Sequence, residues 1–233
     1  MNTILLKLAG PLQSWGTSSR FETRTTERYP SKSAVIGMLG ASFGYLRDDT
    51  RITRFNSLDF ALRIDQPGEF LNDYHIAQKF RANGTFDRTY VTNRQYLQDA
   101  IFVVALGSSD EALVTEIESA LKQPYFQPFL GRRSNPLTAD FLIGIRNTDV
   151  VTSLEELEWQ ASDWYKRRNK DKVILPIYAD AHLLEDSPRQ MVRDEVVSFS
   201  QKERVHRYRA MARKDIVLES SRIKEEHDAF GAF

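Results

Sequence analysis

Arginine recurs every four residues in a segment of the chain that has no hydrophobic period. Arg20, Arg24 and Arg28 lie within residues 10–30, which begin with the run Gly10-Pro-Leu-Gln-Ser-Trp-Gly16. A guanidinium group binds phosphate oxygens through two parallel hydrogen bonds and stacks on flat rings. The pattern favours a polyanion-binding loop with an exposed tryptophan, and the alternative is a solvated face on which the arginines form local ion pairs. The candidate binding residues of this loop are Gln13, Ser14, Trp15, Arg20, Arg24 and Arg28.

A helix is expected to start directly after this loop. Pro30 precedes Ser31, which suits the N-cap of a helix over 31–46. The N-terminal end of a helix attracts phosphate because its first N–H groups lack partners. Lys32 and Ser33 are therefore candidate phosphate ligands, with simple capping as the alternative. A nucleotide-triphosphate loop is not supported, since the spacing of its glycines and its Lys-Ser/Thr pair are missing.

Basic and aromatic side chains interleave between residues 66 and 98. The pair Asn83-Gly84 is typical of a tight hairpin turn, so this insertion is predicted to form a β-hairpin that projects as an arm. Such a mixture resembles the stacking platforms of single-strand nucleic-acid binders. The alternative is an edge hairpin that packs its aromatic side chains on the body. The candidate binding residues of the arm are Lys79, Phe80, Arg81, Arg88 and Tyr90.

Two further basic clusters follow along the chain. Arg132 and Arg133 are adjacent in the run Phe129-Leu-Gly-Arg-Arg-Ser-Asn-Pro136, where glycine lets the backbone approach a ligand closely. Both arginines are candidate nucleic-acid ligands, and the alternatives are an ordinary turn or a pairing with Asp140. Residues 202–214 form the most basic window of the chain, which predicts either a solvated strand face or a contact with RNA or a partner subunit.

Catalytic chemistry has little support in the sequence. The chain has no cysteine and four scattered histidines, so we expect no disulfide, no thiol nucleophile, no metal and no cofactor. A metal-independent ribonuclease needs a base near a Tyr or a second His. His75 with Tyr74, Lys79 and Tyr90 is the only local group of that type, and one His beside one Tyr is common by chance. We therefore expect no catalytic residue and keep an endoribonuclease built on His75 as the alternative.

The charge balance limits how the chain can bind a polyanion. Its 233 residues carry 32 basic and 32 acidic side chains, and 41% are hydrophobic. A net charge of zero argues against binding by bulk charge, but it permits a local basic stripe or a role mainly as a protein–protein adaptor. The first residues lack the pattern of a signal peptide and no stretch is apolar enough to span a membrane, so we expect a cytoplasmic protein without membrane contact.

The predicted elements follow an order that defines a fold class. Apolar runs and helical periodicity predict strand, helix, strand, strand, helix and strand, over 4–8, 31–46, 58–65, 100–106, 110–122 and 141–145. This is the split βαβ order of an α+β, ferredoxin-like (RRM-like) domain, here over 1–146 with the insertion 66–98. Residues 147–233 are predicted to form a smaller β-rich C-terminal subdomain. Its elements are a short acidic helix over 154–164 and strands over 173–177, 191–199 and 216–218.

The beginning of the chain is similar to a known family. Residues 4–44 strongly resemble the CasD subunits of type I-E CRISPR Cascade complexes, which belong to the RAMP superfamily. The order of elements fits up to residue 145. The matching runs are Leu8-Ala-Gly-Pro-Leu-Gln-Ser-Trp-Gly16, Ser19-Arg-Phe21, Arg24-Thr25, Pro30-Ser-Lys-Ser-Ala-Val-Ile-Gly37 and Phe129-Leu-Gly-Arg-Arg133.

The resemblance implies a ferredoxin-like domain with a thumb-like hairpin and a non-enzymatic role. The family caps the 5′ handle of the CRISPR RNA and contacts the adjacent backbone subunit and the large subunit, so that target DNA is met only through the complex. By the match, the Gly-rich loop, the helix start at Lys32-Ser33 and the Arg132-Arg133 turn would line the handle site. The 66–98 arm would be the thumb that kinks the RNA. Related type I-C members cleave the precursor RNA themselves, which is the enzymatic alternative.

Overall fold

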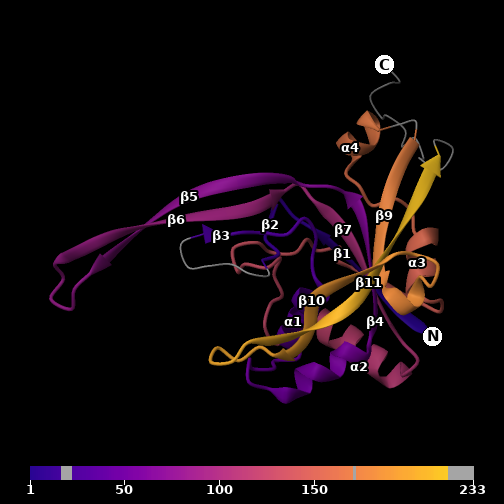
Figure 1. Cartoon of the computed structure of the whole chain (residues 1–233), viewed down its shortest axis with the longest axis horizontal. Helices are drawn as coiled ribbons and strands as arrows, with labels where there is room; N and C mark the ends of the chain where they lie inside the picture. Colours follow the sequence, from indigo (N-terminus) through magenta and orange to yellow (C-terminus); the bar gives the residue numbers. More distant parts are fainter. Residues whose placement is uncertain (17–22, 170–171, 220–233) are drawn as a thin grey trace.

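A seven-stranded antiparallel sheet forms the body of the protein (Figure 1). The computed structural model describes residues 1–16, 23–169 and 172–219, so the predicted ligand Arg20 lies outside the described residues. The strands are β1 (Asn2–Ala9), β4 (Asp59–Gln66), β7 (Ile101–Ser108), β8 (Leu142–Arg146), β9 (Lys172–Asp180), β10 (Arg189–Ser198) and β11 (Val205–Glu219). Their order in the sheet is β10-β11-β9-β4-β7-β1-β8.

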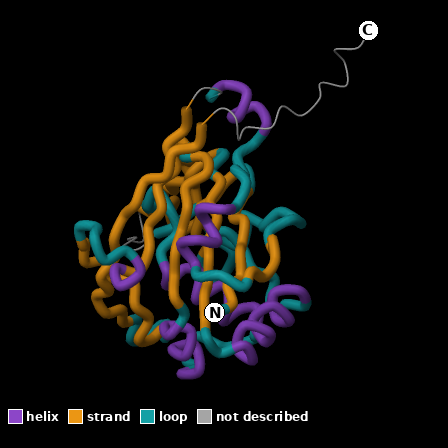
Figure 2. The backbone as a smooth tube through the Cα atoms, turned by 90° about the vertical axis from the view of Figure 1, so that its right-hand side faces the viewer, coloured by secondary structure: helices purple, strands orange, loops and turns teal. Residues whose placement is uncertain are grey.

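Helices pack on both faces of this sheet. Ile4 and Leu8 of β1 belong to the core on one face, while Leu5 belongs to the core on the other, because successive side chains of a strand point to opposite sides. Figure 2 shows the strands side by side with helices packed around them. Within the described ranges, no helix is long and apolar enough to cross a membrane. The helices are α1 (Lys32–Ser42), α2 (Glu111–Lys122), α3 (Val150–Glu156), α4 (Asp163–Arg168) and the 3-10 helices η1 (Thr50–Ser57) and η2 (Ala181–Leu183).

The elements expected in the first half of the chain are present. The predicted strands coincide with β1, β4, β7 and β8, and the predicted helices with α1 and α2. Helix α1 ends at Ser42 rather than at residue 46, because Gly44 adopts a φ of +73° and turns the chain away. The eight-residue helix η1 was not expected, since its sequence has too few apolar positions to show a helical period.

The predicted acidic helix over 154–164 is wrong. Asp149 caps α3, which starts earlier, and α4 forms as a separate short helix. Between them Trp159 donates its indole N–H to the backbone oxygen of Asp65 over 2.7 Å. This bond ties the connecting segment to β4, and a continuous helix could not make it.

The C-terminal strands continue the sheet of the first half. Strand β9 pairs with β4, and residues 211–219 of β11 pair with the whole length of β9. The region 147–233 is β-rich as expected, but its described strands have no sheet of their own. The predicted division after residue 146 therefore lies inside one continuous sheet.

A long β-hairpin stands out from the body as an arm (Figure 1). Its strands are β5 (Glu69–Phe80) and β6 (Phe86–Gln98). The turn lies at the predicted Asn83-Gly84, where Gly84 has a φ of +80°, a conformation that costs little only for glycine. The Asn83 side chain accepts a hydrogen bond from the Thr85 N–H over 3.1 Å, which closes the turn.

The described parts of residues 10–30, which are 10–16 and 23–30, contain regular structure. Two short strands, β2 (Leu12–Gln13) and β3 (Thr23–Arg24), pair with β6 of the arm. Strands of two residues leave no apolar period in a sequence, so periodicity could not reveal them. The pairing ties this segment to the base of the arm.

Candidate nucleic-acid interface

The register of the arm gathers its cationic side chains on one face. Lys79 of β5 lies directly opposite Arg88 of β6, and directly opposed side chains point to the same side. Tyr90 and Arg94 follow Arg88 at intervals of two and six residues, so they share that side. Asp73 lies opposite Arg94, but no ion pair joins them in the described structure. We name this side the basic face; its strand positions are Glu69, Leu71, Asp73, His75, Ala77 and Lys79 on β5, and Arg88, Tyr90, Thr92, Arg94, Tyr96 and Gln98 on β6.

Strand β3 extends the basic face toward the body. It runs parallel to β6, with Arg24 in register with Arg94, so two guanidinium groups lie on the same side of adjacent strands. Arg24 is exposed to solvent, while Arg94 is half-buried. The base of the arm therefore concentrates positive charge.

Arg132 is held against this base by three contacts. Its Nη2 donates to the backbone oxygens of Arg24 and Gln95, each over 3.1 Å. Its guanidinium carbon lies 4.1 Å from the ring centroid of Tyr96, a stacking geometry that holds the guanidinium plane in place. No carboxylate among the described residues pairs with Arg132, so its charge is not neutralised by this part of the protein.

Two buried donor atoms at this junction lack an acceptor. Arg132 Nη1 and Arg94 Nε are inaccessible to solvent and make no hydrogen bond to any described residue. A buried donor without an acceptor costs about 1–3 kcal/mol, and more when it is charged. An anionic ligand at this junction would remove that cost, which makes the two arginines the best-prepared anion site on the basic face.

Gly131 explains how the Arg132 turn reaches the first loop. It has a φ of +81°, and a side-chain carbon at this position would overlap the backbone oxygen of Ser14. The Ser14 N–H donates to the oxygen of Leu130 over 3.1 Å. Two of the runs that carry the family resemblance, residues 8–16 and 129–133, are thus in direct backbone contact.

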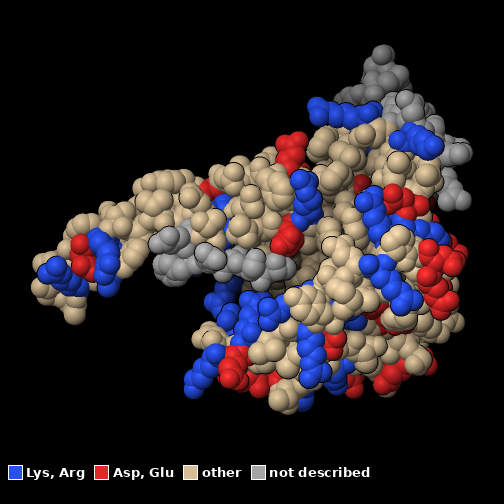
Figure 3. Space-filling view, in the orientation of Figure 1, with Lys and Arg blue, Asp and Glu red and all other residues tan. Residues whose placement is uncertain are grey.

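The tip of the arm carries a looser group of charges. Lys79, Arg81 and Arg88 surround the carboxylate of Asp87 at 3.3, 3.8 and 3.6 Å, which Figure 3 shows as a basic end with one acidic patch. Such exposed pairs are weak, so three cations sharing one anion leave net positive charge. Phe80 lies apart from the basic face, since its ring packs edge-on against Phe86 at 6.1 Å.

Gln13 and Trp15 are corrections to the predicted site. Trp15 was expected to be exposed, but it is 2% exposed and belongs to the core. Its indole N–H donates to the Gln13 side chain over 3.0 Å, and Gln13 donates onward to the oxygens of Leu8 and Ala100. Both side chains therefore have hydrogen-bond partners within the protein, and they hold the first loop against the sheet.

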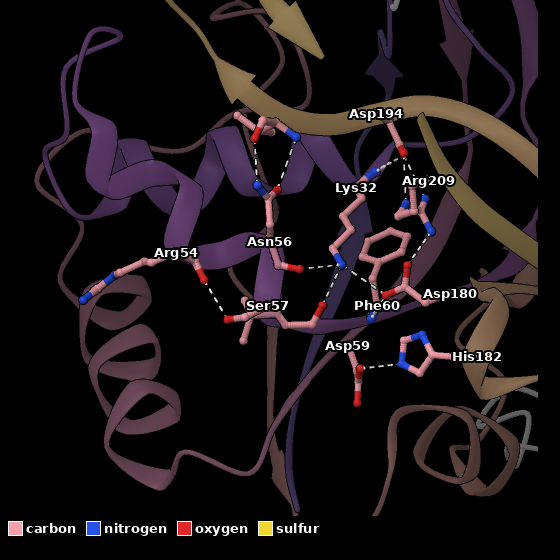
Figure 4. Close-up of polar contacts among 12 residues, drawn as sticks. Lys32, Arg54, Asn56, Ser57, Asp59, Phe60, Asp180, His182, Asp194 and Arg209 are labelled. Atoms are coloured by element: carbon pink, nitrogen blue, oxygen red, sulfur yellow. Dashed lines mark hydrogen bonds and ion pairs between the residues drawn. The ribbon is translucent and has the colours of Figure 1, made fainter. Parts of the chain in front are cut away.

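Lys32 is likewise buried and has internal partners (Figure 4). Its ammonium group donates to the Leu58 oxygen over 2.7 Å and pairs with Asp180 over 3.1 Å. The N–H at the start of α1, which was expected to meet phosphate, instead donates to Asp194 over 2.9 Å. Ser33 is also buried, with its hydroxyl 3.0 Å from that of Ser31. This helix start is occupied by the protein itself.

The basic window 202–214 is partly explained by the same network. Arg209 pairs with Asp180 and Asp194 over 2.7 and 2.9 Å. Burial by itself lowers the pKa of Arg209, but the hydrogen bonds and charges of the two carboxylates raise it above its usual value. Arg213 pairs with Asp215 over 2.8 Å on the exposed side of β11. These cations stabilise the C-terminal strands.

The remaining predicted ligands lie at the edges of the interface. Arg28 is exposed, and its guanidinium carbon lies 5.0 Å above the ring of Phe70 at the base of the arm. Ser14 is buried, and its hydroxyl donates to the Gln95 oxygen over 3.3 Å. Arg133 is exposed beside Arg132. Arg94, one of the basic residues of the arm sequence, and Tyr96 complete the interface. Tyr96 was not predicted; its alternation with Arg94, Thr92 and Tyr90 along one strand was the signal for it.

The residues of the enzymatic alternative are brought together only in part. Tyr74 is next to His75 in β5 and so points to the opposite face of the arm. Lys79 shares the face of His75 but lies four residues further along, about 13 Å away at ~3.3 Å per residue. Tyr90 shares that face too, two residues along β6 from Thr92, the residue opposite His75. The Thr92 hydroxyl lies 3.5 Å from the His75 ring.

Comparison with solved structures defines the class of protein. The chain is similar to a chain of a structure titled CRISPR RNA-guided surveillance complex, with a TM-score of 0.76 and 30% identity over 94% of this chain and 92% of that chain. It is also similar to a structure titled Crystal structure of Cas protein, with a TM-score of 0.64 and 29% identity over 96% and 98% of the two chains.

The family follows from the sequence comparisons. The model of the family described as CRISPR-associated protein (Cas_Cas5) matches residues 3–212, and the chain belongs to this family. It is 35% identical over 183 residues to the CRISPR system Cascade subunit CasD of Escherichia coli (strain K12), which covers 71% of this chain and 81% of that protein. The predicted resemblance to CasD is confirmed.

Proposed function

We propose that this protein is a non-catalytic RNA-binding subunit of a type I-E CRISPR surveillance complex and that it caps the 5′ handle of the CRISPR RNA. The observation that carries the proposal is the pair of buried, unpartnered guanidinium donors of Arg94 and Arg132 on the basic face. Phosphate oxygens are strong acceptors and match the planar geometry of guanidinium groups. A ligand that brings phosphate oxygens to these groups would give the donors acceptors.

The basic face has the length and composition for a single strand. From Arg88 to Arg94 the chain advances six residues, roughly 20 Å at ~3.3 Å per residue. Arg24 and Lys79 place cations at the two ends of this track, and Tyr90 offers a ring between them for base stacking. The RNA backbone would therefore run along the arm, with its tightest contact at the junction with the body.

The family membership supports the finer features of the proposal. We infer that residues 1–146 form a ferredoxin-like domain, because β4, β7, β1 and β8 occupy the strand positions of a split βαβ unit, and that the arm acts as its thumb. The chain would work in the cytoplasm beside the backbone and large subunits of the complex, and would meet target DNA only through them. The position of His75, which faces the Thr92 hydroxyl while Tyr74 points to the other side of the arm, supports a binding role without catalysis.

Fluorescence anisotropy with labelled repeat-derived RNA tests this function. The RNA is used with and without its 5′ handle over a series of salt concentrations, and the same samples are run on a denaturing gel. We expect handle-dependent binding that weakens linearly with the logarithm of salt concentration, at about 0.7 per phosphate contact for a single strand, and intact RNA on the gel.

The possible outcomes are distinct. Handle-independent binding would contradict capping, and cut RNA that becomes intact in His75→Ala would establish the nuclease alternative. Where the isolated chain does not bind, the same titration is repeated with the other subunits of the complex present. Absence of any handle contact there, judged by crosslinking of the labelled RNA to this chain, would overturn the proposal.

A further inference from the structure

The end of the β10–β11 hairpin carries cations that the protein leaves without a carboxylate. Residues 199–204 join the two strands. Arg209 and Arg213 of β11 each pair with an aspartate, but four exposed cations nearer to the loop form no ion pair with any described residue. We name them the hairpin cluster: Arg193, Lys202, Arg204 and Arg207.

The acidic side chains around the hairpin cluster do not balance its charge. Asp194 is buried, and its carboxylate already accepts hydrogen bonds from the Arg209 guanidinium and from the Lys32 N–H, each over 2.9 Å. Glu195 and Glu203 are the other acids within residues 193–209, and neither pairs with a cation of the cluster in the described structure. Two carboxylates beside four cations leave the cluster with net positive charge.

Two guanidinium groups of the cluster converge on His206. Arg193 Nε donates to the backbone oxygen of His206 over 3.2 Å. The guanidinium carbon of Arg204 lies 6.0 Å from the ring centroid of Phe199, and the same ring meets the His206 imidazole edge-on at 5.8 Å. Burial, followed by the charges of Arg204 and Arg193, lowers the pKa of His206, against the influence of Asp194. The three basic groups therefore lie close enough to repel one another.

The His206 side chain has an unsatisfied ring nitrogen. Its Nε2 is inaccessible to solvent and has no hydrogen-bond partner among the described residues. Such a buried polar atom costs free energy, and the nearby like charges add to that cost. Perturbed basic groups that gather without internal partners are typical of binding sites. An anion bound between the two arginines would offset their repulsion.

The loop holds the hairpin cluster in place. The Ser200 N–H donates to the Ser198 hydroxyl over 3.1 Å, and the Lys202 N–H donates to the Ser200 hydroxyl over 3.3 Å. Phe199 packs against the core beside Gly37 of α1. Because the cations are presented from an anchored loop, a ligand has less ordering of the protein to bring about when it binds.

The chemistry around the cluster indicates the type of ligand. Tyr208 is 63% exposed, and it follows His206 by two positions along β11, so the two rings lie on the same side of the strand. Interfaces with nucleic acid are much more positively charged than those between proteins, whose centres are depleted of charge. An exposed ring among cations suits an unpaired base, which favours a single strand such as RNA over a duplex.

We propose that the hairpin cluster is a second phosphate-binding site for the RNA, separate from the basic face of the arm, in which Arg193 and Arg204 hold the backbone and Lys202 and Arg207 flank it. The hairpin end and the arm extend from the same side of the body in Figure 1. The choice of RNA rests on the function proposed above, whereas the anion site itself rests on the contacts and charges of the hairpin. Phosphate contacts carry no sequence information, so this site adds affinity without preference for the handle.

Three double variants test the proposal. Arg193→Gln with Arg204→Gln removes two charges of the cluster, and Arg193→Lys with Arg204→Lys keeps them. Arg189→Gln with Arg213→Gln is the matched control, since it removes two arginines from the same two strands away from the loop. Each protein is titrated by anisotropy with labelled repeat-derived RNA, with and without the handle, over a salt series. The other subunits are added where the isolated chain does not bind, and native mass spectrometry follows assembly of the complex.

We expect the Gln variant of the cluster to lower the log–log salt slope by about 0.7 to 1.4, one or two single-strand phosphate contacts. Its affinity near 0.15 M salt should fall roughly four- to fifteenfold. This factor should be the same for RNA with and without the handle, so that the preference for the handle is unchanged. The Lys variant should retain the slope of the unchanged chain, because phosphate binding at this site depends on charge, and the control should retain it too.

Several results would overturn the proposal. An unchanged slope in the Gln variant would show that RNA does not reach the cluster, and an equal loss in the control would show an effect of net charge alone. Unchanged RNA binding with weaker assembly of the complex would assign the cluster to an acidic partner protein. If the unchanged protein binds RNA without preference for the handle, the proposed capping function fails, while the comparison of slopes still decides whether the cluster binds RNA.

Discussion

Two groups of cations in this protein differ in whether a carboxylate balances their charge. In the ion network of Lys32 and Arg209, every charge meets a carboxylate, with Arg209 bridging Asp180 and Asp194. At the junction of arm and body, the contacts of Arg132 with the described residues are with backbone oxygens and an aromatic ring. The first group is neutralised by the protein, and the second retains its charge for a ligand.

The comparison teaches that the presence of a carboxylate, rather than the number of arginines, separates a structural cation from a binding one. Fully buried Arg63 follows the same rule as Arg209, since it is paired with Asp65 over 2.7 Å and donates to the backbone oxygen of Leu157 at the end of α3. Buried charges persist only when paired in this way. Arg132 and Arg94 break the rule with unpartnered donors, which is why they are the candidates for function.

The largest effect is expected in the buried network. Arg209→Ala leaves Asp180 and Asp194 buried with too few partners, which should lower the free energy of unfolding by about 3–5 kcal/mol. Urea denaturation followed by circular dichroism measures this change. Arg213→Ala on the same strand is the matched control, because its pair with Asp215 is exposed and should contribute no more than about 1 kcal/mol. Equal losses in the two variants would contradict the comparison.

The second effect is expected at the arm junction. Arg132→Ala should weaken handle-RNA binding by about 1.5–3 kcal/mol, the range for hydrogen bonds to charged groups, or roughly ten- to a hundredfold in Kd. Anisotropy titrations measure the change, and unfolding experiments show whether the fold is intact. The neighbouring Arg133→Ala provides the control, since that side chain is exposed and less constrained. If the Arg132→Ala and Arg133→Ala variants bind handle RNA equally well, the unpartnered donors of Arg132 do not make the main contact with the RNA.

A smaller effect is expected at the tip of the arm. Arg88 shares the carboxylate of Asp87 with two other cations, so its net contribution to RNA binding is reduced. Arg88→Ala should lower the salt dependence of binding by about 0.7 in log–log slope, one single-strand phosphate contact, with less than about a tenfold change in Kd at moderate salt. An unchanged slope would show that RNA does not reach the tip.

The smallest effect concerns pH and the β10–β11 hairpin. Burial, together with the charges of Arg204 and Arg193, lowers the pKa of His206, against an opposing influence of Asp194. The unfolded chain then takes up the proton more readily, so this contribution to stability is complete above about pH 6.5 and is lost as pH falls toward the folded pKa. His206→Gln should therefore lose less stability than the unchanged chain between pH 7.5 and pH 5, measured by urea denaturation. A parallel decline in both proteins would contradict this assignment.

Much of the fold was predictable because it depends on local signals. The apolar runs of β1 and β7 and the helical period of α2 appear directly in the sequence, and Asn83-Gly84 marks the arm turn. The site was predictable only in part. Arg24 and Arg132 meet at the base of the arm, and Arg88 and Tyr90 lie farther along the same face. Trp15 and Lys32 are buried elsewhere, because their positions depend on contacts with segments that are distant in sequence.

The sequence by itself determined the family, the order of strands and helices, and a hairpin rich in cations and aromatic rings, because each depends on residues that are neighbours in the chain. Only the tertiary structure decided which cations are available. The Lys32 ammonium group pairs with Asp180 and the Lys32 N–H donates to Asp194, although these residues are 148 and 162 positions away in the sequence. No local sequence pattern predicts contacts over such separations. Strand register likewise decided that Lys79, Arg88 and Arg94 share one face of the arm, because the alternation of side chains along one strand defines a face only when the opposite strand is in place.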